Sequence, residues 1–194
     1  MIDNVISKKQ WSLGKKICVK TIISLTIILT AVGLPQLAHL TMGAQSGIKY
    51  LPMYLPVIIG GAIMGTAWGL GIGILAPVVS FLITSAISNP MPALARLPFM
   101  IAELGVFALV TGTFSKLVYK KPWTAFIAVL TAEIIGRSVF IGLIAIFAKY
   151  TPFSVPMIWV QIKTGFIGLA LQALIAPLVI IGIRYLIKKD AENA

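Results

Sequence analysis

Long apolar runs recur along this chain, separated by short connections that carry the prolines and most of the charged residues. A membrane-spanning helix needs about 20 apolar residues, so six of them would fill about 120 positions. Hydrophobic residues make up 59% of the chain and charged residues 11%, against about 45–50% and about 25% in soluble domains. The sequence therefore predicts an all-α, polytopic membrane protein, with residues 1–194 forming one six-helix domain and no separate catalytic domain.

Prolines and glycines mark where the predicted helices end, because both residue types interrupt helical hydrogen bonding or favour turns. The predicted helices cover the ranges 16–37, 52–64, 70–85, 98–119, 123–148 and 157–187. The connections expected between them include a polar stretch over 36–53, a glycine break over 65–69, an ordered turn over 85–97 and a loop over 149–156.

Basic side chains are distributed unevenly between the connections expected on the two sides of the membrane. With six helices both termini lie on one side, and cytoplasmic loops carry the excess of Lys and Arg. If the termini are cytoplasmic, the outer connections hold Lys49, Arg96 and Lys149. The cytoplasmic side then holds Lys8, Lys9, Lys15, Lys16, Lys20, Lys116, Lys120, Lys121, Arg184, Lys188 and Lys189. We therefore expect cytoplasmic segments at 1–15 and 188–194, a location in the cell membrane, and basic residues that orient the chain rather than bind nucleic acid.

Several residue combinations that commonly form disulfides, metal sites or phosphate-binding loops are missing from the sequence. Cys18 is the single cysteine, which excludes an internal disulfide and a multi-cysteine metal cluster. His39 is the single histidine, and we expect it to be a solvated loop residue rather than a metal ligand or base. The phosphate-binding pattern GxxxxGK[ST] is absent, so the chain itself is not expected to hold ATP. We accordingly predict no catalytic residue, no metal site and no cofactor in this chain.

Four charged side chains fall inside the apolar runs: Glu103, Glu133, Arg137 and Lys163. A charge at membrane depth costs several kcal/mol unless it is paired or reached by water, so such residues mark functional sites. With the termini in the cytoplasm, most of these side chains lie in the outer half of the membrane. The sequence therefore predicts a polar cavity that opens to the outside.

Glu133 and Arg137 stand four residues apart, the spacing at which side chains on one helix meet, with the acid on the favourable N-terminal side. Such a pair is either self-neutralising and structural, or part of a binding site, and both interpretations stay open. Lys163, on another predicted helix, is an alternative partner that would neutralise the charge of Glu103. In that case the role of Glu103 is structural.

Trp159, Lys163 and Phe166 fall on one face of the last predicted helix. An aromatic group beside a cation resembles the wall of a small-molecule site, although Trp159 equally suits the aromatic belt of a membrane interface. Arg96 either holds a ligand carboxylate through its planar guanidinium or lies at the rim facing water.

Small residues four apart let membrane helices approach closely. Gly61, Gly65, Gly69 and Gly73 follow that spacing and predict packing within the domain. Thr26 and Thr30 form a similar small face, which either docks another membrane subunit or packs within the fold. Gln172 is expected to form a hydrogen bond between helices.

Several runs together resemble the S components of energy-coupling factor (ECF) vitamin transporters, and most of all the pantothenate type. They are YLPVIIGGAIMG over 54–65, APVVS over 76–80, NPMP over 89–92, ELGVFALVTG over 103–112 and the Gly136-Arg137 pair. The resemblance implies a bacterial membrane subunit that captures a vitamin outside and reorients in the membrane to release it inside. Its implied partners are a transmembrane T component and two cytoplasmic ATPase subunits that use ATP.

An anionic vitamin such as pantothenate suits the cationic residues near the predicted cavity. The expected substrate-binding residues are Gln45, Lys49, Tyr50, Asn89, Arg96, Glu103, Arg137, Trp159 and Lys163. Alternatives are an S component for pyridoxine, hydroxymethylpyrimidine, folate or cobalamin, or a free-standing secondary transporter with Glu103 or Glu133 as proton carrier. A membrane enzyme or enzyme-assembly subunit is disfavoured, because the apolar runs hold no cluster of His, Cys or Asp.

Overall fold

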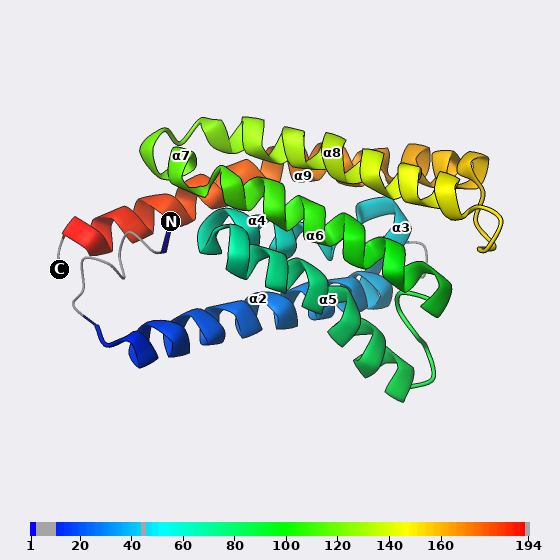
Figure 1. The fold of residues 1–194 in the computed structure, drawn as a ribbon, viewed down its shortest axis with the longest axis horizontal. Helices are drawn as coiled ribbons and strands as arrows, with labels where there is room; N and C mark the ends of the chain where they lie inside the picture. The colour runs from blue at the N-terminus through cyan, green and yellow to red at the C-terminus, as the bar shows by residue number, and fades with distance from the viewer. Residues whose placement is uncertain (3–10, 44–45, 193–194) are drawn as a thin grey trace.

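The computed structural model describes residues 1–2, 11–43 and 46–192, and this part of the chain is helical, without a strand. The helices are α2 (Leu13–Met42), α3 (Ser46–Tyr50), α4 (Tyr54–Met64), α5 (Thr66–Ala86), α6 (Leu97–Thr113), α7 (Ser115–Lys120), α8 (Thr124–Phe147) and α9 (Val155–Glu192), with a 3₁₀ turn at Leu94–Arg96. The long helices lie roughly side by side in one bundle, with α2 along one side and α8 and α9 along the other (Figure 1).

Within the described residues, five helices are long and apolar enough to cross a membrane, by length and composition. They are the helices at Leu13–Met42, Thr66–Ala86, Leu94–Thr113, Thr124–Phe147 and Pro156–Lys189. The predicted all-α membrane protein is confirmed to this extent. The remaining predicted helix, 52–64, corresponds to α4, which is apolar but has only 11 residues.

The first predicted connection is much shorter than expected. Helix α2 continues through Pro35 to Met42, and α3 occupies part of the remaining stretch, so the polar connection predicted over 36–53 is wrong over most of its length. Membrane helices tolerate proline because neighbouring groups satisfy the backbone positions that it frees. As a result, His39 lies on the last turn of α2 rather than in a loop.

Two further boundaries differ from the prediction. The break expected over 65–69 is the single residue Gly65, whose φ of 84° favours glycine and whose N–H bonds to the carbonyl of Gly61 at 2.9 Å. The helix expected over 98–119 is divided after Thr113 into α6 and α7. This division follows Gly112 and Thr113, two weak helix formers.

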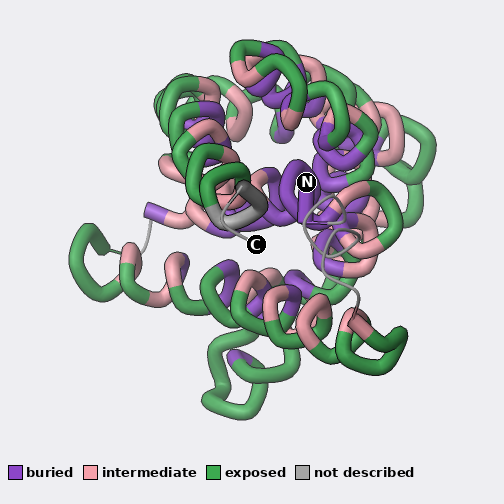
Figure 2. The backbone as a smooth tube through the Cα atoms, turned by 90° about the vertical axis from the view of Figure 1, so that its left-hand side faces the viewer, coloured by how far each residue is buried: buried purple, intermediate pink, exposed green. Residues whose placement is uncertain are grey.

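Glycines bring α4, α5 and α6 into close contact, as their spacing predicts. A Cβ on Gly69 would lie 2.8 Å from the Cα of Gly61, and one on Gly73 would lie 2.5 Å from the carbonyl oxygen of Leu104. Side chains at these positions would force the helices apart. Seen along the bundle, the buried segments gather at its centre and the outer faces of the peripheral helices are exposed (Figure 2).

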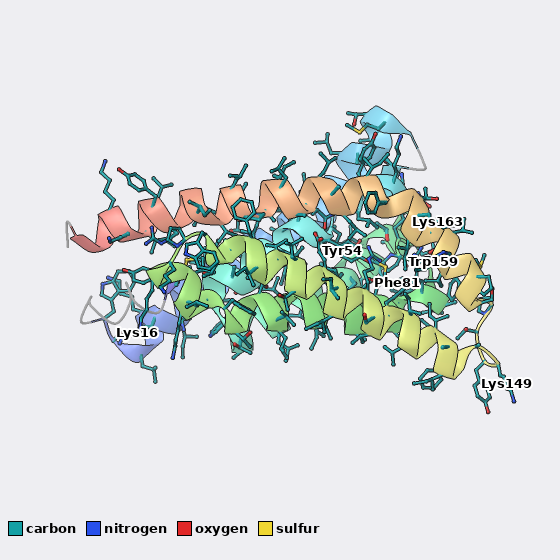
Figure 3. All side chains as sticks on the ribbon, turned by 90° about the horizontal axis from the view of Figure 1, so that it is seen from above. Lys16, Tyr54, Phe81, Lys149, Trp159 and Lys163 are labelled. Atoms are coloured by element: carbon teal, nitrogen blue, oxygen red, sulfur yellow. The ribbon has the colours of Figure 1, made fainter. Side chains whose placement is uncertain are left out.

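The two ends of the bundle differ in charge. Lys16 and Lys149 lie at opposite ends, and Tyr54 lies nearer the middle (Figure 3). Helix α7 and both chain termini lie at the Lys16 end (Figure 1). Most basic side chains in the described part of the chain therefore lie at one end, as the uneven distribution of Lys and Arg between the connections predicts.

Candidate functional site

A cavity of about 310 Å³ lies beside the C-terminal part of α2, away from Lys16 on the first turn of that helix. Its walls come from the last turns of α2, from α3, from the segment that enters α4, and from the 91–96 segment before α6. Most lining side chains are apolar. The polar groups among them are few, namely His39, Tyr54, Ser80 and Arg96. This combination of apolar walls and a few polar groups is typical of small-molecule sites.

The cavity exists because α4 is short. Eleven residues extend about 16 Å at 1.5 Å per residue, against a hydrocarbon core of about 30 Å. Helix α4 therefore begins well inside the bundle, at Tyr54, and the space above its first turn is left open. Leu51, Pro52, Met53 and Tyr54 line that space.

Non-helical backbone at membrane depth requires partners inside the protein, and α9 supplies them. The side-chain amide of Gln172 donates to the carbonyl oxygens of Tyr50 at 3.1 Å and Leu51 at 2.9 Å. Gly168, one turn earlier, allows this approach, since a Cβ there would lie 2.7 Å from the Tyr50 carbonyl carbon. The expectation of a hydrogen bond from Gln172 between helices is confirmed, and its acceptor is the end of α3.

Three polar side chains form a buried cluster next to the cavity, which one of them, Tyr54, also lines. The hydroxyl of Tyr54 donates to Glu103 Oε2 at 2.5 Å, and Arg137 forms an ion pair with Glu103 Oε1 at 2.7 Å. The Arg137 guanidinium also lies 4.9 Å from the centre of the Tyr54 ring. Since Glu103 is fully buried, this pairing stabilises its charge, and the cluster joins α4, α6 and α8.

The expected neutralising partners are therefore corrected. The ion pair of Arg137 joins it to Glu103 on α6 rather than to Glu133 on its own helix, and the partner of Glu103 is Arg137 rather than Lys163. The physical reason is burial, because a completely enclosed carboxylate gains most from a counter-charge. Glu133 is 8% exposed, and no group among the described residues forms a hydrogen bond with its Oε1.

Arg96 is the cation that lines the cavity. One terminal nitrogen donates to Gln161 Oε1, and the guanidinium lies 5.8 Å from the centre of the Phe140 ring. Among the described residues, neither its buried Nε nor Nδ1 of His39, which also lines the cavity, has a hydrogen-bond partner. These two nitrogens leave hydrogen-bonding capacity at the cavity that no group in the described part of the chain uses.

The remaining predicted site residues are not brought to the cavity. Lys49 is exposed and lies over the ring of its neighbour Tyr50, at 5.4 Å. Asn89 is exposed, as are Trp159 and Lys163 on the outer face of α9. Within the described residues these side chains are absent from the lining, while Gln45 lies outside the described residues. The predicted wall of Trp159, Lys163 and Phe166 faces outward because α9 turns Ile158, Gly165 and Gly168 toward the bundle.

Sequence reasoning missed the groups that shape the cavity. Tyr54 lies within a run that carries the resemblance. Its hydroxyl, in an apolar run between Pro52 and Pro56, was a signal in the sequence that would have identified it as a candidate site residue. Ser80 and Thr84 act through the backbone of Met91. Ser80 donates to its carbonyl oxygen at 2.7 Å, and Thr84 accepts from its N–H at 2.8 Å. These bonds hold the turn that carries Arg96, and local sequence does not reveal them.

Among the described residues, no group of three His, Cys, Asp or Glu side chains is placed to hold a metal ion. Among its described lining residues the cavity offers one guanidinium, one imidazole and apolar walls, since the hydroxyls of Tyr54 and Ser80 already donate to Glu103 and to the Met91 carbonyl. Comparison of the chain with protein-family models, curated proteins and solved structures found no match.

Proposed function

We propose that the chain is the substrate-binding membrane subunit of an ATP-driven importer, an ECF-type S component that captures a small water-soluble vitamin. The observation that carries the proposal is the cavity at the end away from the basic side chains. Excess Lys and Arg mark the cytoplasmic side, so this cavity would open to the outside of the cell. In this proposal α4 completes the sixth crossing together with the α3 segment, and both termini are cytoplasmic.

The form of the site also favours transport over a purely structural role. Interrupted helices at membrane depth are the usual place for substrate sites in transporters, and the chain is interrupted between α3 and α4. The resemblance to S components points the same way. In that scheme a T component and two ATPase subunits supply the energy, and this chain supplies the binding site.

The substrate proposed is a small carboxylate, with pantothenate as the best candidate. Arg96 lies at the cavity with Nε unpartnered, and guanidinium groups bind carboxylates through paired hydrogen bonds. Arg137 is already neutralised by Glu103, so among the described lining residues Arg96 is the cation available to a ligand. A volume of about 310 Å³ is at the lower end for small-molecule sites, which favours pantothenate over folate or cobalamin.

The test is calorimetric titration of the purified protein with pantothenate. Replacing Arg96 by Ala removes the ligand's counter-charge, and we expect affinity to fall at least tenfold, about 1.4 kcal/mol. Lys163→Ala is the matched control, because that cation is exposed and away from the cavity. Thermal unfolding of both variants separates lost binding from lost folding. If the folded Arg96→Ala protein bound pantothenate with the same affinity as the parent protein, the assignment of Arg96 as the carboxylate-binding residue would be contradicted.

A second candidate is a proton-coupled secondary transporter, and Glu133 is the observation that favours it. This carboxyl group is nearly buried and one oxygen has no hydrogen-bond partner, as expected of a side chain that exchanges a proton. Proteoliposomes containing the chain alone distinguish the two proposals. Uptake driven by a pH gradient and abolished by Glu133→Gln supports the secondary transporter, whereas the importer proposal expects no uptake without ATPase subunits.

A further inference from the structure

Gln161 on α9 binds the guanidinium of Arg96, the cation on the cavity wall. A terminal nitrogen of Arg96 donates to Oε1 of Gln161, and both side chains are half-buried. Gln161 is absent from the described residues that line the cavity. Any effect of Gln161 on a ligand in the cavity therefore passes through the guanidinium of Arg96.

Apolar packing fixes the face of α9 that carries Gln161. Ile158 and Ile162 lie on that face, three residues before and one residue after Gln161, and both pack in a cluster with Phe140 of α8. The Arg96 guanidinium lies 5.8 Å from the centre of the same Phe140 ring. The amide and the guanidinium are therefore held against one packed surface.

Two arginines inside the bundle have partners of different charge. Arg137 forms an ion pair with the carboxylate of Glu103 at 2.7 Å, and the other oxygen of Glu103 accepts from Tyr54. Arg96 is held by a neutral amide instead. A carboxylate partner cancels the charge of a guanidinium, whereas an amide oxygen accepts its hydrogen bond and leaves the charge in place. Arg96 is thus positioned without being neutralised by Gln161.

We propose, on the basis of the proposed capture of a small carboxylate, that Gln161 determines the charge selectivity of the cavity. Its neutral side chain positions Arg96 and leaves the positive charge for the carboxylate of a ligand. A carboxylate at position 161 would form an internal ion pair with Arg96, and an anionic ligand would have to compete with that pair. Gln161 is therefore a specificity-determining residue that acts through Arg96.

Two substitutions separate the charge of this partner from its positioning role. Gln161→Glu keeps an oxygen acceptor for Arg96 and adds a negative charge. Gln161→Met keeps the length of the side chain, removes the acceptor and adds no charge. If Gln161 served only to position Arg96, the Met variant would bind a carboxylate more weakly than the Glu variant. We expect the opposite order, because the Glu variant neutralises Arg96.

The first measurement is calorimetric titration with pantothenate and with pantothenol, which carries an alcohol in place of the carboxylate. We expect the parent protein to prefer pantothenate by about tenfold or more, and the Gln161→Glu variant to bind the two about equally. The Gln161→Met variant should keep the preference. Lys163→Ala is the matched control, because it lowers the net charge by the same amount at an exposed position. Thermal unfolding checks that each variant is folded.

The second measurement does not depend on which vitamin the cavity binds. The chain contains three arginines, Arg96, Arg137 and Arg184, so isotopically labelled arginine gives few side-chain Nε–H signals in a nuclear magnetic resonance spectrum. Formate is the probe, and formamide at equal concentration is its neutral control. We expect formate to shift the Arg96 signal in the parent and Gln161→Met proteins but not in Gln161→Glu. The signal of Arg184, whose Nε donates to the Tyr119 carbonyl at 3.0 Å, should not move.

Three outcomes overturn the assignment of Gln161. One is a formate shift of Arg96 in the Gln161→Glu variant equal to that of the parent protein. Another is no formate shift of Arg96 in the parent protein. The third is a Gln161→Met variant that loses the response to formate as completely as Gln161→Glu, since the hydrogen bond rather than the charge would then decide. If pantothenate fails to bind the parent protein while the expected formate pattern holds, the proposed vitamin is wrong and the role of Gln161 stands.

Discussion

Single residues decide how the interior of this bundle tolerates charge. Glu103 is fully buried and is stabilised by Tyr54 and Arg137. Removing one member of a buried ion pair leaves the other charge uncompensated, at a cost of about 3–5 kcal/mol. We therefore expect Glu103→Gln and Arg137→Met each to lower the free energy of unfolding by about 3 kcal/mol. Chemical denaturation in detergent measures the loss.

The double variant is the control for this prediction. With Glu103→Gln and Arg137→Met combined, neither member of the Glu103–Arg137 ion pair is left as an unpaired charge, and the glutamine oxygen still accepts from the Tyr54 hydroxyl. Replacing a buried ion pair by neutral groups is often close to neutral in stability. The double variant should accordingly be more stable than either single variant. A double variant as unstable as the sum of the two would contradict the proposed charge pairing.

The limits of sequence reasoning are clearest for these same residues. The scarcity of charge in apolar runs was sufficient to single out Glu103, Glu133 and Arg137. Their pairing was not predictable from spacing, because the four-residue rule considers one helix, whereas Arg137 reaches across to α6. Arg96 was identified because it precedes an apolar run. Its position in the cavity wall depends on the Met91 turn held by Ser80.

At the level of helices, close contact between α5 and α6 depends on where the glycines face. Gly73 faces the carbonyl of Leu104, where an added Cβ would lie at 2.5 Å, whereas Gly71 on the same helix faces open space. We expect Gly73→Ala to destabilise the protein by about 1–3 kcal/mol, because overpacking forces backbone shifts. Gly71→Ala should be neutral or stabilising, since alanine is the better helix former.

Melting temperatures of the two purified variants check this prediction with the same substitution on the same helix. A Gly73→Ala protein as stable as the Gly71→Ala protein would show that α5 and α6 are not in close contact at Leu104. The four-residue spacing of the glycines over 61–73 predicted close packing of this type. It did not distinguish the packing residues from Gly65, which instead ends α4 with a φ of 84°.

Helix boundaries were harder to predict than helix positions, and α2 and α4 explain why. The chain continues as helix through Pro35, although proline usually marks an end. It also leaves the helix at Leu51, where Gln172 from a distant helix satisfies the free carbonyls. The end of the helix at Leu51 thus depends on a partner supplied by tertiary packing. A pattern of apolar runs therefore locates the helices well and their ends poorly.

For the molecule as a whole, the uneven charge of its two ends predicts one orientation in the membrane. Cys18 is the single native cysteine, so a Cys18→Ser background allows one reporter cysteine at a time. Lys120 and Lys149 are both exposed, and they lie beyond the two ends of α8. We expect a membrane-impermeant thiol reagent to label Lys149→Cys in intact cells, and to label Lys120→Cys only after the membrane is opened.

This orientation decides which side of the membrane the cavity serves. Arg96 and Phe153 line the cavity near the Lys149 end of α8, so labelling of Lys149→Cys from outside places the cavity mouth where an imported vitamin first arrives. Protection of that site, with labelling of Lys120→Cys instead, would turn the cavity toward the cytoplasm and contradict capture from outside. The basic end would then face outward, against the asymmetry that orients membrane helices. Labelling at both sites in sealed cells would mean that the chain inserts in both orientations, and that charge alone does not orient it.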